Sequence, residues 1–211
     1  MAPETHQRVA LLLSPERLFT AEEVLSRPSP VPKAPGVYAW YFGEVPPGVP
    51  TEGCHQVLGH MLLYVGIAPK APPQNGRKAS ATSLYQRVNY HFSGNAYGST
   101  LRLTLGCLLG DRLSIQLQRV GSGKTRTFTN PGEQRLDAWM ANHARVVWVT
   151  TEQPWVLEDE LIRKLNLPLN LAGNRSHPFS ATLSAIRSRA AVRAAEMPVA
   201  NRGGARKLTA L

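Results

Sequence analysis

The sequence predicts an α+β fold: a small, mainly antiparallel core sheet of three strands, flanked by helices. The main signal is three short runs rich in β-branched and aromatic residues, at 36–42, 61–67 and 144–151, because such runs are typical of strands. The first two runs follow one another along the chain, and consecutive strands joined by a loop usually pair antiparallel. An inserted β-hairpin and helical extensions at both ends complete the predicted architecture.

The N-terminal segment, residues 1–30, is predicted to be a polar arm with a short helix, because Thr20 and Glu23 have the spacing of a capping box. Four prolines in RPSPVPKAPG then favour a stiff, extended lead-in. The first strand, GVYAWYF, follows at 36–42 and is broken by a Pro- and Gly-rich loop before the second strand.

Helices are predicted in the middle and late parts of the chain. A second capping box, Ser83 with Gln86, opens a helix that runs to about Phe92. The apolar run at 101–110 is also predicted to be helical. Further helices are predicted at 132–143, at 154 to about 166, and at 180 to about 196, the last with Leu183, Ile186 and Ala190 on one face.

Residues 112–129 are predicted to form the inserted hairpin, because apolar and polar residues alternate before a Gly-Ser-Gly turn. This turn reads GSGKT, which is similar to the end of a phosphate-binding P-loop. The first glycine of that motif would fall on Gln118, and the residues after the turn are strand-like. No helix N-terminus would face a phosphate, so we interpret GSGKT as a hairpin turn.

Charge and composition narrow the class of partner. Lys and Arg number 24 against 14 Asp and Glu, a net charge of +10, which favours a polyanion: nucleic acid or an anionic membrane surface. Cys54 and Cys107 stand far apart, which argues against a disulfide framework and a thiolate zinc site. No apolar run approaches the ~20 residues of a membrane span, so we expect a cytoplasmic protein without a membrane partner.

Candidate functional residues stand on or at the ends of these elements. Tyr38 and Tyr64 lie on the first two strands, where antiparallel pairing can bring both hydroxyls to one face. Gly66 would let the backbone turn and a ligand approach it closely. Arg87 and His91 are four residues apart and so project from one face of their helix.

Two further candidates lie later in the chain. Glu158 is near the start of the helix that begins at Pro154, where the helix dipole favours an anion, and Asn170 ends the segment NLPLN. Each candidate also has an ordinary structural explanation: tyrosines fill cores, arginines cover solvated helix faces, and Glu158 with Asp159 and Glu160 could be a plain acidic first turn.

In this order the residues resemble the GIY-YIG nuclease superfamily. GVY at 36–38 stands for the first motif word and YVG at 64–66 for the second. That family then has an arginine, a glutamate and an asparagine, which here are Arg87, Glu158 and Asn170, with an interval of twelve from the glutamate to the asparagine. The resemblance covers about residues 35–175. It implies a metal-dependent endonuclease that hydrolyses phosphodiester bonds of DNA, restriction- or repair-like, without excluding RNA.

The resemblance also implies roles for the residues. Glu158 would hold a single Mg²⁺ (or Mn²⁺), an ion that takes one or two carboxylates together with water and phosphate. Arg87 would stabilise the scissile phosphate. Tyr38 would assist deprotonation of the attacking water, which requires the metal and Arg87 to lower its pKa from about 10.

The resemblance implies supporting roles for the three remaining candidates. Tyr64 would orient the water or the phosphate. His91 would bond the phosphate or relay a proton. Asn170 would brace the site without touching the substrate.

The chain departs from the family pattern in its insertions. A nuclease-like domain is expected at 31–176, with insertions at about 43–60 and 100–135, followed by a basic helix and tail at 177–211. No separate DNA-reading domain accompanies the core, so the insertions and tail would supply substrate choice. The predicted nucleic-acid contacts are Arg87, Arg175, Arg187 and Arg189. A stand-alone core usually needs two copies to cut both strands, so a homodimer is a possible assembly.

Two other functions fit parts of the pattern. A non-catalytic, basic nucleic-acid-binding module on the same fold would show salt-sensitive binding and no cleavage with any metal. A membrane-surface binder acting through the 180–196 helix would bind liposomes without nucleic acid.

Overall fold

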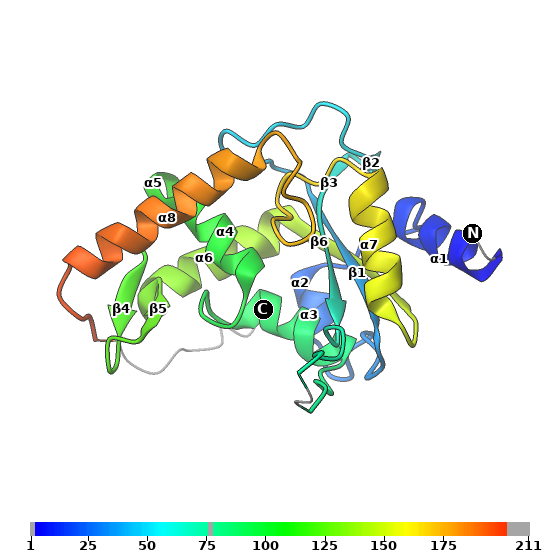
Figure 1. The fold of residues 1–211 in the computed structure, drawn as a ribbon, viewed down its shortest axis with the longest axis horizontal. Coiled ribbons are helices and arrows are strands. Elements are labelled where there is room, and N and C mark those ends of the chain that lie inside the picture. The colour runs from blue at the N-terminus through cyan, green and yellow to red at the C-terminus, as the bar shows by residue number, and fades with distance from the viewer. Residues whose placement is uncertain (1–2, 76–77, 202–211) are drawn as a thin grey trace.

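The computed structural model describes residues 3–75 and 78–201 and shows a twisted antiparallel sheet between two layers of helices (Figure 1). The elements, in chain order, are α1 (Pro3–Leu13), α2 (Ala21–Leu25), β1 (Gly36–Phe42), β2 (Gln56–Val57), β3 (His60–Ala68), α3 (Leu84–Ser93), α4 (Thr100–Leu108), α5 (Gly110–Leu113), β4 (Gln118–Val120), β5 (Thr125–Thr127), α6 (Thr129–His143), β6 (Ala144–Thr150), α7 (Pro154–Lys164) and α8 (Ser180–Glu196). The mixed α and β content agrees with the predicted fold class.

The main sheet has four strands in the order β2-β3-β1-β6, one more than predicted. The three predicted strands are its core, and β1 pairs antiparallel with both β3 and β6. The additional strand, β2, comes from the 43–60 insertion. It turns into β3 through Leu58 and Gly59, which both have positive φ. Only one of these two turn residues is a glycine, so the local hairpin signal is weak.

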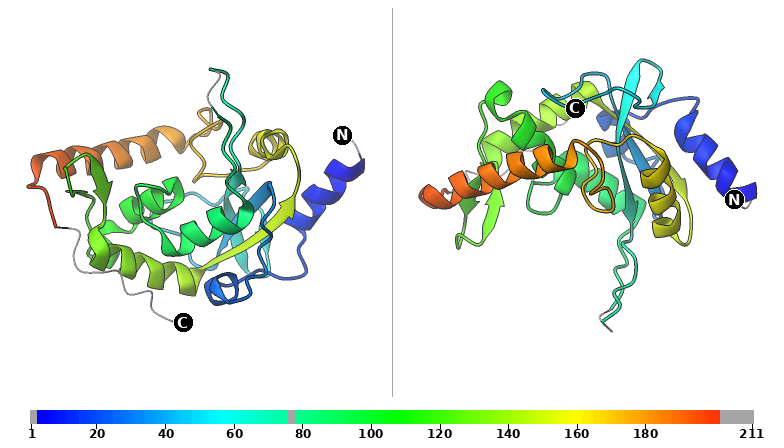
Figure 2. Two further views of the ribbon diagram at one scale, coloured as in Figure 1. Left: turned by 90° about the horizontal axis from the view of Figure 1, so that it is seen from below. Right: turned by 45° about the horizontal axis from the view of Figure 1, so that its top comes forward.

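The sheet is covered on both faces, which explains why the whole of β1 is buried. One face packs Val37, Ala39 and Tyr41 against α1 and α7. The other face carries Tyr38, Trp40 and Phe42 into a larger core formed with α2, α3, α4, α6 and α8. Figure 2 shows the two helical layers on opposite sides of the strands. Because strand residues alternate between faces, Tyr38 necessarily points toward α3.

The predicted helices are present, and both predicted capping boxes are formed, at Thr20 with Glu23 and at Ser83 with Gln86. The apolar run at 101–110 is helical as α4. The N-terminal arm also contains a helix that was not predicted, α1, whose Leu12 is buried against the sheet. Tertiary packing of a few apolar residues therefore stabilises it, rather than a strong local signal.

The predicted hairpin at 112–129 is much shorter than expected: only β4 and β5 pair, around a turn in which Gly121 and Gly123 have positive φ. Before it, α5 ends at Ser114 in the left-handed conformation. After it, α6 already begins at Thr129. The alternation of Ile115 and Leu117 reflects burial of an extended segment that pairs with no strand.

The C-terminal helix α8 covers residues 180–196 as predicted, with Leu183 buried and Ile186 and Ala190 partly buried. Three basic residues of the predicted tail, Arg202, Arg206 and Lys207, lie outside the described residues. Over the described part of the chain, no helix has the length and apolar character needed to cross a membrane.

Candidate active site

The two predicted tyrosines lie on the same face of neighbouring strands. Tyr38 of β1 pairs in register with Gly66 of β3, and Tyr64 lies two residues before that glycine. The Tyr38 ring occupies the space above Gly66: a Cβ added there would lie 2.5 Å from the phenolic oxygen and 2.7 Å from the adjoining ring carbon. The glycine of YVG is therefore needed so that the first tyrosine can lie across the second strand.

The Tyr38 hydroxyl is 2.8 Å from Nε2 of His91, the last-turn residue of α3. Both side chains are buried, with 1% and 0% of their surface exposed. On its other side, His91 Nδ1 is 2.7 Å from the Ser99 hydroxyl. A buried chain of polar groups thus links β1 to α3 and to the N-terminus of α4.

Asn170 holds the backbone of β3 at the residue between Tyr64 and Gly66. Its side-chain oxygen accepts the N–H of Val65 and its amide donates to the carbonyl of Val65, both at 2.9 Å. A side-chain amide that hydrogen-bonds both the N–H and the C=O of one residue pairs with the backbone as a neighbouring strand would. The asparagine that ends NLPLN therefore fixes the part of β3 that carries Tyr64.

A pocket of about 470 Å³ opens beside this stretch of β3. Its polar and charged lining comes from five separate elements or loops: Tyr64, Thr100, Thr104, Glu158, Asp159, Asn170 and Arg187. Tyr38 and Arg87 are not among the lining residues. The Tyr38 hydroxyl nevertheless lies close to the pocket, because the pKa of this hydroxyl responds to Tyr64, Arg87 and Glu158. The fold thus brings together four predicted residues that are separated by up to 120 positions in the sequence.

Glu158 is a partly buried carboxylate whose environment disfavours its charge. Burial and the neighbouring Asp159 raise its pKa to about 7, although Lys70 opposes the shift. The expected help from the helix dipole is absent, because α7 begins at Pro154 and its first turn contains no acidic residue. Within the part of the chain that the structure describes, the Glu158 carboxylate makes no hydrogen bond or ion pair.

The two phenols are neutral in this state. Burial is the main cause of the raised pKa of Tyr38, and the nearby Tyr64 adds to it, while Arg87 acts in the opposite direction. Burial also raises the pKa of Tyr64, and a hydrogen bond with Thr100 partly offsets it. The expectation that Arg87 lowers the pKa of Tyr38 has the right sign, but desolvation outweighs it in the protein without a cation.

Arg87 is held at the edge of this group by a hydrogen bond from its Nη1 to the carbonyl of Gly98, at 2.8 Å. Burial, with smaller contributions from the Arg87 guanidinium and from Arg102, keeps the pKa of His91 well below the ordinary value, so that imidazole is neutral. With His91 and Tyr38 both neutral, Arg87 is the predicted cation whose charge acts on both phenols.

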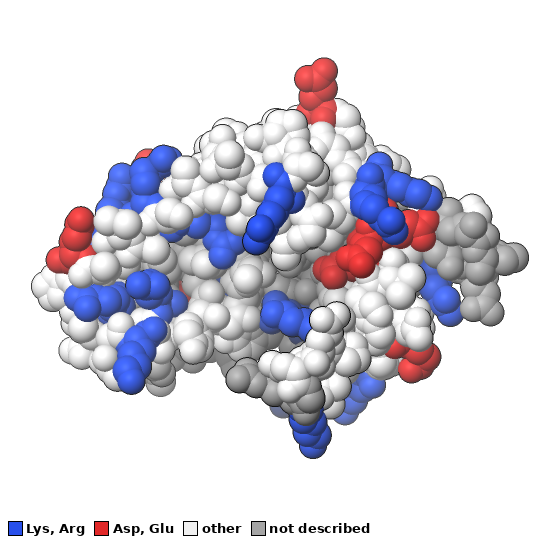
Figure 3. All heavy atoms as spheres, viewed as in Figure 1, with Lys and Arg blue, Asp and Glu red and all other residues white. Residues whose placement is uncertain are grey.

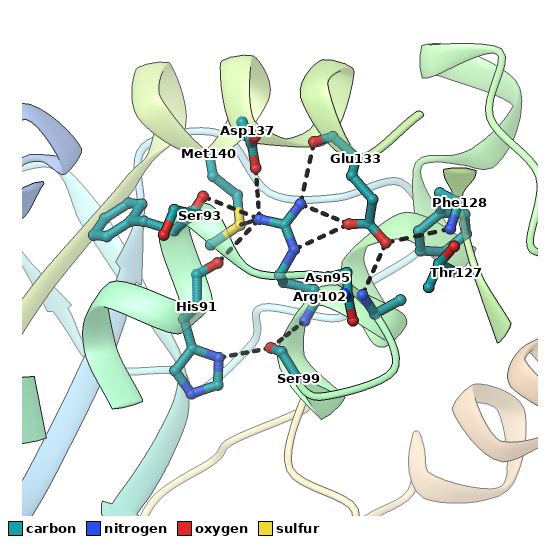
Figure 4. Close-up of polar contacts among 12 residues, drawn as sticks. His91, Ser93, Asn95, Ser99, Arg102, Thr127, Phe128, Glu133, Asp137 and Met140 are labelled. Carbon is teal, nitrogen blue, oxygen red and sulfur yellow. Dashed lines mark hydrogen bonds and ion pairs between the residues drawn. The ribbon is translucent and has the colours of Figure 1, made fainter. Parts of the chain in front are cut away.

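A buried ionic network that the sequence analysis did not predict contacts the backbone of α3 at His91 (Figure 4). The Arg102 guanidinium is fully buried and donates two bonds to Glu133 Oε2, at 2.6 and 3.1 Å, and it pairs with Asp137 at 2.7 Å. It also donates to the carbonyls of His91 and Phe92, at 3.1 and 3.0 Å, which are among the unpaired carbonyls at the end of α3.

The second oxygen of Glu133 completes the network by accepting the backbone N–H groups of Ala96 and Phe128. A buried ion pair that has all its hydrogen bonds satisfied is stable, whereas one with a missing partner is costly. The sequence did contain a signal: Arg102 is the single charge in the apolar run LRLTLGCLL. A charged residue in such a run must find a buried partner.

The predicted nucleic-acid contacts do not all lie at the pocket. Arg187 lines it and lowers the pKa of Tyr64. Arg189 instead lines a cavity on another side of α8 with Cys107 and Arg193. Arg175 is exposed in the loop before α8. Among the described residues, no cluster of three or more His, Cys, Asp or Glu could form a metal site without substrate.

Comparison with known proteins identifies the family. The family model described as the GIY-YIG catalytic domain matches residues 36–189, which extends from the first residue of β1 into α8. No curated protein and no solved structure gave a match. The matched segment contains the strands that carry Tyr38 and Tyr64, which are β1 and β3, together with helices α3 to α7. The chain therefore belongs to the GIY-YIG catalytic-domain family, and this membership implies nuclease activity.

Proposed function

We propose that this protein is a metal-dependent endonuclease that hydrolyses phosphodiester bonds of DNA. The observation that carries the proposal is the grouping of Tyr38, Tyr64, Arg87 and Glu158 about one pocket in a GIY-YIG catalytic domain. Phosphodiester hydrolysis places extra negative charge on the phosphate oxygens and the leaving oxygen, and cations fixed in the site can stabilise this charge.

Glu158 is the candidate ligand for a single Mg²⁺ (or Mn²⁺). The donor set fits such an ion, because an unpaired, partly buried carboxylate faces a pocket that also carries Tyr64 and Asn170 and Mg²⁺ takes few carboxylates together with water and phosphate. When bound, the ion would polarise the phosphate and acidify a bound water. Glu158 would hold the ion in its ionised form, so a bound cation would lower the pKa that burial raises.

Tyr38 would accept the proton of the attacking water, and His91 would stabilise Tyr38 through a hydrogen bond. The Ser99 hydroxyl accepts the N–H of Arg102 at 3.1 Å, and its remaining partner among the described residues is His91 Nδ1. We assign the hydroxyl proton to that bond, since a buried hydroxyl rarely leaves its proton unpaired.

This assignment leaves a proton on His91 Nε2, which donates to the Tyr38 oxygen. The Tyr38 proton then points away from His91. That proton would pass through a water molecule to the solvent, and the N–H of His91 would then stabilise the Tyr38 phenolate, which takes the proton of the attacking water. In this proposal Tyr38 is the base, and His91 supports it without accepting the proton.

The other residues would position and neutralise the substrate. Arg87, tied to the loop at Gly98, would contact the scissile phosphate. Tyr64 and Arg187 line the pocket and would orient the phosphate from two sides. Asn170 would act indirectly, through the β3 backbone at Val65. Arg175 and Arg189, which lie away from the pocket lining, would contribute only long-range attraction.

Supercoiled plasmid incubated with purified protein and Mg²⁺ or Mn²⁺ tests the proposal. We expect the wild type to produce nicked circles and Glu158→Gln to lose at least 100-fold in rate, since removal of one charge-stabilising group usually costs about that much. Glu152→Gln, an exposed carboxylate just before α7, is the matched control and should cleave as the wild type does. Absence of cleavage across salts and metals, or equal rates for Glu158→Gln and wild type, would contradict the proposal. Binding without cleavage would identify the non-catalytic module instead.

A further inference from the structure

A second groove continues from the active-site pocket along the inserted hairpin. This hairpin groove has a volume of about 490 Å³ and shares Leu171 and Arg187 with the pocket. Its other polar and aromatic lining residues are Tyr97, Lys124, Arg126, Ser184 and Ser188. The groove is therefore formed largely by the GSGKT turn region, the loop before α4, and one face of α8.

The groove carries three positive charges and no negative one in its lining: Lys124, Arg126 and Arg187. Within the described residues none of the three forms an ion pair. Figure 3 shows Lys and Arg side chains gathered over the part of the molecule where α8 and the β4–β5 hairpin lie. A row of unpaired cations that leads to a phosphate-cleaving pocket is suited to a continuing phosphodiester backbone.

The hairpin is held in a fixed position against α8. The Arg119 side chain of β4 donates to the carbonyls of Ala194 and Met197, at 3.2 and 2.7 Å, at the end of that helix. The Ala200 N–H donates to the carbonyl of Arg119 at 2.8 Å. Arg119 thus attaches the hairpin to α8, while its cross-strand neighbour Arg126 remains at the groove.

Tyr97 is an exposed aromatic residue on an ordered loop. Its side chain is 69% exposed, yet its backbone N–H and that of Gly98 both donate to the Asn95 side-chain oxygen, at 3.1 and 3.3 Å. Arg87 donates to the carbonyl of Gly98. The loop that presents Tyr97 is therefore fixed by the same arginine that we assign to the scissile phosphate.

We infer that the hairpin groove binds a single-stranded segment of DNA adjacent to the cleavage site. Lys124, Arg126 and Arg187 follow its phosphates, and Tyr97 stacks on an unpaired base. An aromatic ring at the edge of a basic groove can stack on a base only when that base is free of its duplex neighbours. The inference extends the proposed function by naming its substrate class: DNA with an unpaired region beside the scissile bond.

Fluorescence anisotropy with labelled DNA in EDTA tests the charges without cleavage. The probes are a 30-nucleotide single strand, the matching blunt duplex, and a fork made of both. We expect Lys124→Ala/Arg126→Ala to weaken binding to the single strand and fork about tenfold or more, and to lower the slope of log affinity against log salt by about 1.4, or about 0.7 per lost phosphate contact. Arg27→Ala, which removes an exposed charge after α2 and outside the lining of both the groove and the pocket, should leave that slope unchanged.

The stacking role has a separate test with the same probes. We expect Tyr97→Ala to weaken single-strand and fork binding about 5- to 150-fold and duplex binding less than twofold, while Tyr97→Phe binds as the wild type does. These residues are exposed, so thermal melting of each variant should match the wild type.

The inference is overturned if the double variant binds all probes as the wild type does, or if Tyr97→Ala weakens duplex and single strand equally. Plasmid cleavage is scored independently. A protein that nicks plasmid but shows either of these binding results keeps its proposed function and loses this inference. A protein that shows the expected binding and never cleaves keeps the groove and loses the nuclease mechanism.

Discussion

Gly66 and Tyr38 form a fitted pair: the phenol of Tyr38 lies across the one position of β3 that has no side chain. A Cβ at residue 66 would come within 2.5 Å of the Tyr38 oxygen and within 2.8 Å of two ring carbons. The backbone of Gly66 has no special conformation to explain its presence. The glycine is required by the neighbouring strand's side chain.

Gly66→Ala should therefore displace the Tyr38 phenol from His91. We expect a loss of about 1–3 kcal/mol in the free energy of unfolding, as for other overpacked positions, and a fall of 100-fold or more in cleavage rate. Urea unfolding and plasmid cleavage measure the two effects. In Gly66→Ala/Tyr38→Ala the steric conflict is gone, so the double variant should lose less stability than the sum of the two single variants. Strict additivity would show that the two residues do not interact.

Activity should depend on pH through Glu158. Only the ionised carboxylate can bind the cation, and its pKa is about 7, so the cleavage rate at low Mg²⁺ should rise as the pH approaches 7 and level off above it. Because the metal competes with the proton, raising Mg²⁺ should move this midpoint to lower pH. Initial rates from pH 5.5 to 8.5 at two Mg²⁺ concentrations provide the measurement. A midpoint that does not respond to Mg²⁺ would argue against Glu158 as the ligand.

The raised pKa of Glu158 also predicts that removing its charge increases the stability of the fold at high pH, although the same change should abolish cleavage. The folded-state pKa of Glu158 exceeds its ordinary value of 4.5, so ionisation destabilises the fold and stability falls as the pH rises from about 4.5 through 7. Glu158→Gln lacks this charge. We expect it to unfold at a higher temperature than the wild type at pH 8, by about 1–3 kcal/mol in unfolding free energy, and to show no such gain at pH 4. An unchanged melting temperature at pH 8 would count against burial of this charge.

The tautomer of His91 can be observed directly. With ¹⁵N-labelled histidine, we expect His91 Nε2 to show the shift of a protonated nitrogen and Nδ1 that of an unprotonated one, since Ser99 donates to Nδ1 in our assignment. Ser99→Ala should release this preference and change the pH profile of cleavage, while DNA binding stays constant. The reverse tautomer in the wild type would mean that His91 accepts the Tyr38 proton.

Loss of one partner from the buried Arg102–Glu133 pair should destabilise the fold strongly. Arg102→Met leaves a buried carboxylate without its cation, and we expect a loss of about 3–5 kcal/mol in unfolding free energy. Asp137→Asn is the matched comparison, because the Asp137 side chain is 30% exposed and partly exposed pairs contribute about 0–1 kcal/mol. Urea unfolding of both variants decides the matter, and equal losses would show that burial does not control the strength of this network.

Local signals predicted the elements that position the site. The aromatic and β-branched run at 36–42 coincides with β1, the capping boxes at Thr20 and Ser83 are formed, and the run at 144–151 contains β6. These signals are reliable because each depends on residues adjacent in the chain. The pairing of β1 with β3 then brings Tyr38 and Tyr64 to one face without further information.

Features that depend on distant contacts were not predictable in the same way. The strand β2 depends on a two-residue turn with one glycine, and α1 is stabilised by packing on the sheet. The helix that carries Glu158 was predicted, but the environment of its carboxylate was not: burial by surrounding elements raises the pKa that the helix dipole was expected to lower. Ser99 and Arg102 support His91 only because α4 packs beside α3, and no local pattern reveals that contact.

The central claim is that Glu158 holds the catalytic cation in the pocket beside Tyr64. Crystals soaked with Mn²⁺ test it most directly, because the anomalous signal of manganese locates the ion without reference to activity. We expect one ion bonded to the Glu158 carboxylate and within reach of the Tyr64 side of the pocket, and no ion there in Glu158→Gln. An ion bound elsewhere in a protein that cleaves DNA would contradict the account.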